Sequence, residues 1–156
     1  MLIAATACFG QKSIDKLFAS YSDRDNFITF RIGGPLLRFA VACDKDGDDD
    51  NDFLREIREI RIIAQKDDDE KMPGFYNKVM SDINTDEYEE FMRVKSTDEN
   101  MIMLVKGDGQ NFKEFLMVAG GEDNIVLQIK GTISYHDAQK LAENAKKDHG
   151  KNMFHD

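Results

Sequence analysis

The residues whose types and spacing come nearest to a chemical site form an acidic run at positions 44–52. The run reads Asp-Lys-Asp-Gly-Asp-Asp-Asp-Asn-Asp, and carboxylate oxygens are the ligands that Ca²⁺ prefers. The common calcium loop needs glycine at its sixth position and glutamate at its twelfth. A loop that starts at Asp44 has arginine twelfth, and one that starts at Asp48 has phenylalanine sixth. We therefore interpret the run as a solvated acidic loop. The alternative is a calcium site with the ligands Asp44, Asp46, Asp48 and Asp50.

Histidine and serine residues give no catalytic pattern. The three histidines are His136, His149 and His155, and neither a His-x-x-x-His nor a Cys-x-x-Cys spacing occurs, so we predict no zinc site. Ser134 stands two residues before His136, but both lie at the start of one predicted helix, where serine acts as a cap. We predict no catalytic residues. An uncharacterised hydrolase is an alternative, and it would require a pocket lined by convergent polar groups.

Residues 1–10 are apolar, small and uncharged. They are typical of the second half of a secretory signal peptide, so we predict an exported protein of the periplasm or cell envelope, with the domain at 11–156. An ordinary apolar N-terminal strand is one alternative. In another, Cys8 carries a lipid anchor, although Ala5 stands where the usual lipidation motif has leucine. Removal of Cys8 would leave Cys43 alone, so we predict no disulfide and expect Cys43 to be a buried apolar residue.

Length and charge narrow the class of protein and partner. The chain has 156 residues, which suits one domain with a sizeable core. Its net charge of −9 would repel nucleic acid and anionic membrane surfaces. No apolar run approaches the roughly 20 residues that a membrane-spanning helix needs. These features indicate a soluble globular domain and argue against nucleic acid or an anionic membrane surface as its partner.

Helices and strands alternate in the first half of the chain. Ile14, Leu17, Phe18 and Tyr21 fall on one stripe of a helix that starts near Ser13. A strand is predicted at 27–32 and another at 59–65, because both runs are rich in β-branched residues. Pro35 is typical of a helix start between them, and a Met and aromatic stripe predicts a further helix at 72–83.

Four apolar runs at 88–95, 101–106, 112–118 and 125–130 predict a meander of antiparallel strands. Glycine, Asp and Asn separate the later runs, and these residues allow the chain to reverse within a few positions. A last helix follows Ser134, which forms a capping box with Asp137, and we expect the polar tail after about residue 147 to be frayed. The predicted fold is α+β, a mostly antiparallel sheet with helices packed on one face. The pairing of the first two strands is open, with a parallel arrangement as one alternative.

Side-chain alternation predicts one apolar sheet face and one mixed face. Apolar residues on the mixed face are Phe91, Phe115, Met117 and Val126. Methionine and aromatic side chains suit adaptable contacts, so we predict that these four residues bind a protein partner or a second copy of the chain. Packing of the same face against a loop or helix is the alternative.

The meander also resembles a known bacterial family, the domain of unknown function numbered 4252. The resemblance is carried by three segments: Tyr88-Glu-Glu-Phe-Met-Arg-Val-Lys95, Phe115-Leu-Met-Val-Ala-Gly-Gly-Glu-Asp123 and Val126-Leu-Gln-Ile-Lys-Gly-Thr-Ile133. The order of elements matches over residues 13–146. The resemblance implies a small exported protein, often a lipoprotein, and brings no activity, substrate or catalytic residue with it. We therefore predict an exported, non-catalytic domain that binds a protein or envelope component.

Overall fold

The computed structural model describes residues 14–43, 52–68 and 70–153. Six strands form one sheet, and they are β1 (Phe27–Gly33), β2 (Ile57–Gln65), β3 (Glu89–Lys95), β4 (Asn100–Gly107), β5 (Asn111–Gly120) and β6 (Ile125–Ser134). The helices in the described part are α1 (Ile14–Ser22), α2 (Gly34–Cys43), α3 (Asp52–Arg55), α4 (Phe75–Asp82) and α5 (Tyr135–Met153). The predicted α+β class is confirmed.

The strand order in the sheet is β1-β2-β6-β5-β4-β3, and every neighbouring pair is antiparallel. Strands β3 to β6 are consecutive neighbours, which confirms the predicted meander. β1 and β2 pair in antiparallel register, with Phe30 opposite Ile62. β2 then joins the meander through β6, with Ile62 opposite Leu127.

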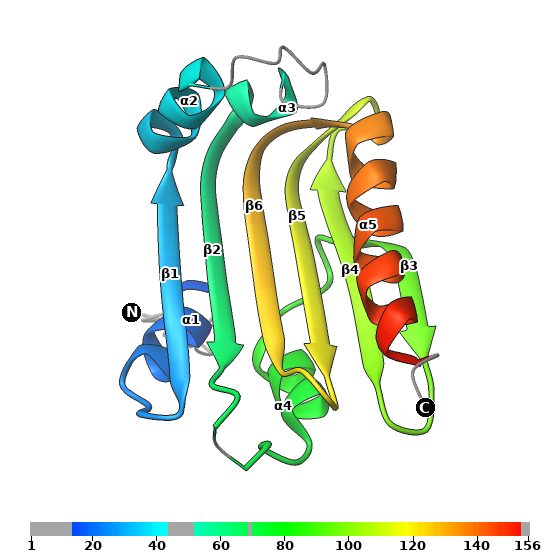
Figure 1. Cartoon of the computed structure of the whole chain (residues 1–156). Helices are drawn as coiled ribbons and strands as arrows, with labels where there is room; N and C mark the ends of the chain where they lie inside the picture. Colours follow the sequence, from blue (N-terminus) through cyan, green and yellow to red (C-terminus); the bar gives the residue numbers. More distant parts are fainter. Residues whose placement is uncertain (1–13, 44–51, 69, 154–156) are drawn as a thin grey trace, which may run out of the picture.

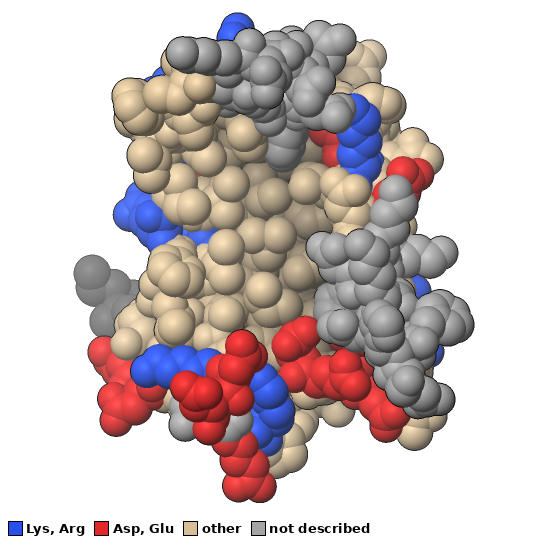
Figure 2. Space-filling view, in the orientation of Figure 1, with Lys and Arg blue, Asp and Glu red and all other residues tan. Residues whose placement is uncertain are grey.

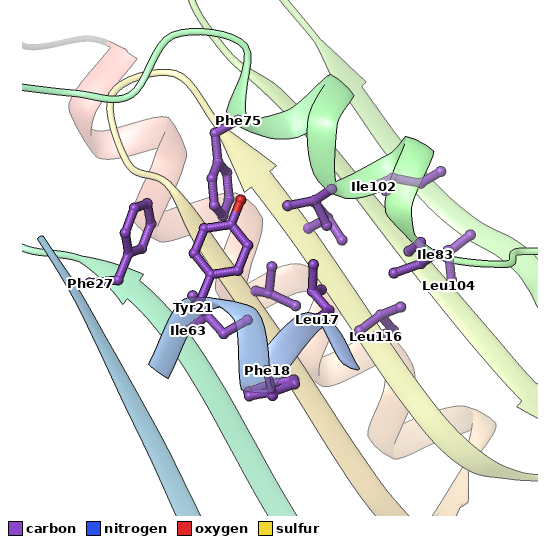
Figure 3. Close-up of a cluster of buried hydrophobic side chains, with 13 residues drawn as sticks. Leu17, Phe18, Tyr21, Phe27, Ile63, Phe75, Ile83, Ile102, Leu104 and Leu116 are labelled. Carbon is purple, nitrogen blue, oxygen red and sulfur yellow. The ribbon is translucent and has the colours of Figure 1, made fainter. Parts of the chain in front are cut away.

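Helices α1 and α4 cover one face of the sheet, which we call the back face. Tyr21, on α1, packs edge-on against Phe27 and Phe75, with ring centroids 4.7 and 5.6 Å away (Figure 3). The strands contribute Ile63, Leu104, Leu116, Val118 and Val126 to the same buried cluster. This core fits the apolar stripe of α1 that the sequence indicates, because Leu17, Phe18 and Tyr21 all face the sheet.

Helix α5 lies on the opposite face, which we call the front face (Figure 1). Ala138 and Ala142 are buried there in one cluster with Met103, Phe115 and Met117. The helices are thus divided between the two faces, whereas the sequence led us to expect them on one. The reason is that the front side of β4 and β5 is as apolar as the back, so both sides need a covering layer.

A capping box fixes the start of α5. The Ser134 hydroxyl accepts a hydrogen bond from the backbone N–H of Asp137 at 3.2 Å and donates one to its carboxylate at 2.7 Å, as the predicted capping box requires.

Cys43 is exposed, contrary to our expectation, because α2 turns Leu37 into the core and leaves Leu36 and Phe39 in solvent. None of the described helices is long and apolar enough to cross a membrane.

Candidate functional site

A groove of about 480 Å³ runs along the front face beside α5. Its floor consists of three buried side chains of the meander: Met103, Phe115 and Met117. Ala64, Ile125, Leu127 and Leu141 are half-buried walls. Figure 2 shows that the middle of this face carries no charged side chains, whereas acidic side chains, with Lys or Arg side chains among them, gather at its lower end. The groove is therefore an apolar channel that α5 leaves open to solvent.

One end of the groove is polar and is held by a buried amide pair. The Asn124 side-chain amide donates to Gln65 Oε1 at 2.7 Å and to the Met72 carbonyl at 3.1 Å. Gln65 in turn donates to the Glu70 carbonyl at 2.8 Å. These bonds join the loop after β2 to the turn between β5 and β6. They also satisfy the buried amide groups, which would be costly to leave without hydrogen-bond partners.

Two exposed carboxylates, Asp67 and Asp123, line this same end of the groove. Asp67 comes from the loop after β2, and Asp123 stands beside Asn124 in the turn between β5 and β6. Lys71 lies close to this pair, with its ammonium 3.5 Å from Asp67. Since Asp67 is 93% exposed in its side chain, this ion pair is weak. The groove thus has an apolar floor and an acidic end.

The four predicted partner-binding residues do not form one surface. Phe115 and Met117 are in the groove floor. Phe91 lies farther along the front face, where it packs edge-on against Phe112 at 5.8 Å. Val126 is fully buried on the back face among the residues of α1 and α4. The register explains the difference, because Met117 lies opposite Leu127 and therefore shares its face with Leu127 rather than with Val126.

The predicted calcium ligands Asp44, Asp46, Asp48 and Asp50 lie outside the described residues. Within the described ranges, no group of three or more His, Cys, Asp or Glu side chains is arranged to hold a metal ion. The calcium site stays a prediction, to be tested by calorimetric titration with Ca²⁺.

A second, polar pocket of about 290 Å³ lies on the back face. Glu114 is at its centre, where its carboxylate accepts hydrogen bonds from the Tyr88 hydroxyl and, at 2.8 Å, from the Gln128 amide. Gln128 Oε1 accepts a hydrogen bond from Arg61 Nε at 2.7 Å. Three strands, β2, β6 and β5, thus contribute to one chain of hydrogen bonds. Sequence reasoning did not find this pocket, although each strand places a polar residue among apolar ones there.

Two ion pairs border this pocket. Arg61 lies 2.7 Å from Asp15 and 4.5 Å above the Phe18 ring, and Lys106 is 2.6 Å from Glu87. Burial raises the pKa of Glu114, and the hydrogen bond from Gln128 and the charges of Lys130 and Arg61 oppose that shift. The pocket can therefore hold a proton on Glu114 to higher pH than an ordinary glutamate would. Its described lining includes no serine, cysteine or histidine that could act as an activated nucleophile.

Comparison with curated proteins found no match, and comparison with solved structures found none either. A family model does match, over residues 21–141. The matched range includes all six strands, α2, α3 and α4, the floor of the front-face groove and the core of the polar pocket. This chain therefore belongs to the family described as Domain of unknown function (DUF4252).

Proposed function

We propose that this domain is a non-catalytic binding domain, and that the front-face groove binds a segment of a protein partner. The observation that carries the proposal is the combination of an open apolar channel with two exposed carboxylates at one end. An apolar floor supplies affinity, and a few polar groups at the rim supply orientation. The partner segment that fits this combination has apolar side chains next to a lysine or arginine.

The floor of the groove is suited to segments of varied shape. Met103 and Met117 have unbranched, polarisable side chains that adjust to different apolar partners. Leu127 and Leu141 are half-buried, so a bound segment would remove further apolar area from water without displacing the core. Burying one leucine-sized side chain contributes about 1.5–3 kcal/mol.

Charge favours a basic partner. The chain carries −9 overall, and Asp67 and Asp123 concentrate negative charge at the end of the groove. Complementary charge steers association and selects among partners of equal apolarity. An acidic segment would place like charges together at this end and bind more weakly.

Synthetic peptides of about ten residues, the span of a long strand, test the proposal. Three sequences are compared by fluorescence anisotropy with the full chain: alternating Leu and Lys, alternating Leu and Glu, and alternating Ser and Lys. We expect the Leu/Lys peptide to bind more than about tenfold more tightly than either of the others, because only it satisfies both the floor and the acidic end. Equal binding of the Leu/Lys and Ser/Lys peptides would mean that charge alone attracts them, and the proposal would be abandoned.

Variants locate the binding to the groove. Leu127→Asp places a charge in the wall and should abolish Leu/Lys binding, whereas Thr132→Asp makes the same charge change at an exposed position of the same strand and should not. Exchange of both Asp67 and Asp123 for lysine should transfer the preference to the Leu/Glu peptide. If Leu127→Asp and Thr132→Asp bind alike, the groove is not the site.

We also propose that the domain acts outside the cytoplasm, in the periplasm or cell envelope. The support is the uncharged apolar composition of residues 1–10, which is typical of part of a signal peptide. Cell fractionation tests the location: recovery of the protein with a cytoplasmic marker enzyme and an intact N-terminus would exclude export. Partition into a detergent phase that is lost in Cys8→Ser would indicate the lipid anchor.

A further inference from the structure

The two edges of the sheet differ in how well they are protected against pairing with another strand. β3, at one edge, has a register shift between Glu90 and Met92 and carries Glu89, Glu90, Arg93 and Lys95. Bulges and charged residues are the devices that keep edge strands from pairing with other chains. β1, at the other edge, pairs in unbroken register over residues 27–33 and contains one charged residue, Arg31. Within the described residues, the β1 edge therefore lacks that protection.

Exposed apolar side chains concentrate at this same edge. The described chain has five large hydrophobic residues that are well exposed, and four of them lie on β1 or α2: Ile28 at 38%, Phe30 at 54%, Leu36 at 59% and Phe39 at 65%. Such a concentration marks an interaction surface more often than it marks free surface. On the front face, the apolar side chains of β1 continue those of β2, because Ile28, Phe30 and Ile32 pair with Ala64, Ile62 and Ile60 respectively.

The sequence of β1 is complementary to itself. It reads Phe-Ile-Thr-Phe-Arg-Ile-Gly, so that two isoleucines flank Phe30 symmetrically at a distance of two residues. If two copies of β1 pair antiparallel with Phe30 on the two-fold axis, Ile28 of each copy lies opposite Ile32 of the other and the two Phe30 rings meet. Arg31 then lies opposite Thr29, and no like charges face each other. Apolar cross-strand pairs of this kind stabilise antiparallel pairing.

We propose that this protein forms a symmetric dimer in which the β1 strands of two copies pair antiparallel and join their sheets into one. Two-fold symmetry requires a surface that is complementary to itself, and the pattern around Phe30 meets that requirement. The dimer leaves the groove beside α5 open, because none of the groove residues belongs to β1. Dimerisation and peptide binding are therefore separate properties, and either can fail without the other.

Light scattering on the full chain gives the first test. At about 100 µM protein, far above the Kd of a micromolar self-association, we expect twice the monomer mass. Phe30→Glu places two carboxylates on the two-fold axis and should give a monomer with an unchanged circular dichroism spectrum. Tyr135→Glu changes an aromatic residue of similar exposure, 48%, outside β1 and should stay dimeric. A monomeric natural chain, or a dimeric Phe30→Glu variant, would overturn the proposal.

A cross-linking test keeps the proposal open to refutation even if Phe30→Glu does not fold. In a chain with Cys8→Ser and Cys43→Ser, Phe30→Cys places one thiol from each copy on the axis, within reach of a disulfide. Mild oxidation should convert most of the protein to a covalent dimer. Ile62→Cys, one strand further into the sheet on the same face, should stay uncross-linked. Failure of Phe30→Cys to cross-link, or equal cross-linking of the two variants, would show that β1 does not pair as proposed.

Discussion

Replacing Tyr21 with phenylalanine should make the protein more stable, although Tyr21 is at the centre of the back-face core. Its side chain is fully buried, and its hydroxyl has no hydrogen-bond partner within the described part of the chain (Figure 3). A buried hydroxyl without a partner costs about 1–3 kcal/mol, and Phe keeps the ring contacts with Phe27 and Phe75. We expect Tyr21→Phe to raise the free energy of unfolding by about 1 kcal/mol.

The dependence of folding stability on pH provides a second, independent test of this prediction. Burial raises the pKa of Tyr21, the charge of Arg24 opposes the shift, and Asp82 adds to it. In the unfolded chain tyrosine loses its proton near pH 10, so above that pH the unfolded state binds fewer protons than the folded state. The natural protein should therefore lose stability as the pH rises past about 10, whereas Tyr21→Phe should lose less.

Urea denaturation followed by circular dichroism measures both effects, at pH 7 and at several values from about 9 to 11. At pH 7 a gain of about 1 kcal/mol corresponds to a rise in Tm of about 2–4 °C for a chain of this size. Tyr135→Phe is the matched control, because Tyr135 is 48% exposed and its hydroxyl can reach solvent. If Tyr21→Phe destabilises the protein while Tyr135→Phe is neutral, the hydroxyl has a stabilising partner and the reasoning fails.

Two further predictions concern the polar pocket and a turn. Burial raises the pKa of Glu114, so the contribution of this residue to stability is fully present below the unfolded pKa of about 4.3 and is lost as the pH rises through the folded pKa. In urea titrations, the stability of Glu114→Gln relative to the natural protein should therefore increase from pH 4 to pH 8. A constant difference in stability between the two proteins would contradict this prediction. Gly121 has a φ of 135°, and a Cβ there would overlap the Asp98 carbonyl, whereas Gly109 has a φ of 95° and open space around it. Gly121→Ala should cost about 3 kcal/mol and Gly109→Ala about 1 kcal/mol in thermal denaturation, and equal costs would show that the turn at Gly121 relaxes.

Local patterns in the sequence were sufficient for the elements of the meander. Glycine, Asp and Asn at 107–111 and 120–124 fix where the chain reverses, so the strands on either side are consecutive neighbours. The alternation also placed Ile125 and Leu127 opposite Val126 correctly. The alternation could not show whether Val126, or instead Ile125 and Leu127, lies on the same face as Phe115, because that depends on the register between β5 and β6. A shift in that register between Phe112 and Glu114 leaves no recognisable signal in the sequence.

Contacts between distant segments explain why the polar pocket was missed. Glu114 and Gln128 come from the consecutive strands β5 and β6, whereas Arg61 comes from β2, which is far from them along the chain and becomes their neighbour because β2 pairs with β6. Neither turn residues nor periodicity report such a pairing. A usable signal was nevertheless present, since each of these strands carries a polar residue at a position whose alternation points toward the back face. Three such interruptions on one face indicate a shared polar site rather than three unrelated exposures.

The uncovered apolar part of the front face follows from the dimensions of the fold. Six strands spaced about 4.8 Å apart span about 24 Å, whereas one helix with its side chains is about 10 Å wide. α5 therefore covers only part of the front face, and Figure 1 shows it over the side that holds β3 and β4. Polar residues would fit the remaining strands equally well, since solvated sheet faces usually alternate with polar side chains. The chain instead places Ile28, Phe30 and Ile62 there, where they increase the risk of aggregation unless another molecule covers them. An apolar face that the described helices leave partly uncovered is thus the physical reason to look for the function of this domain in association with a partner.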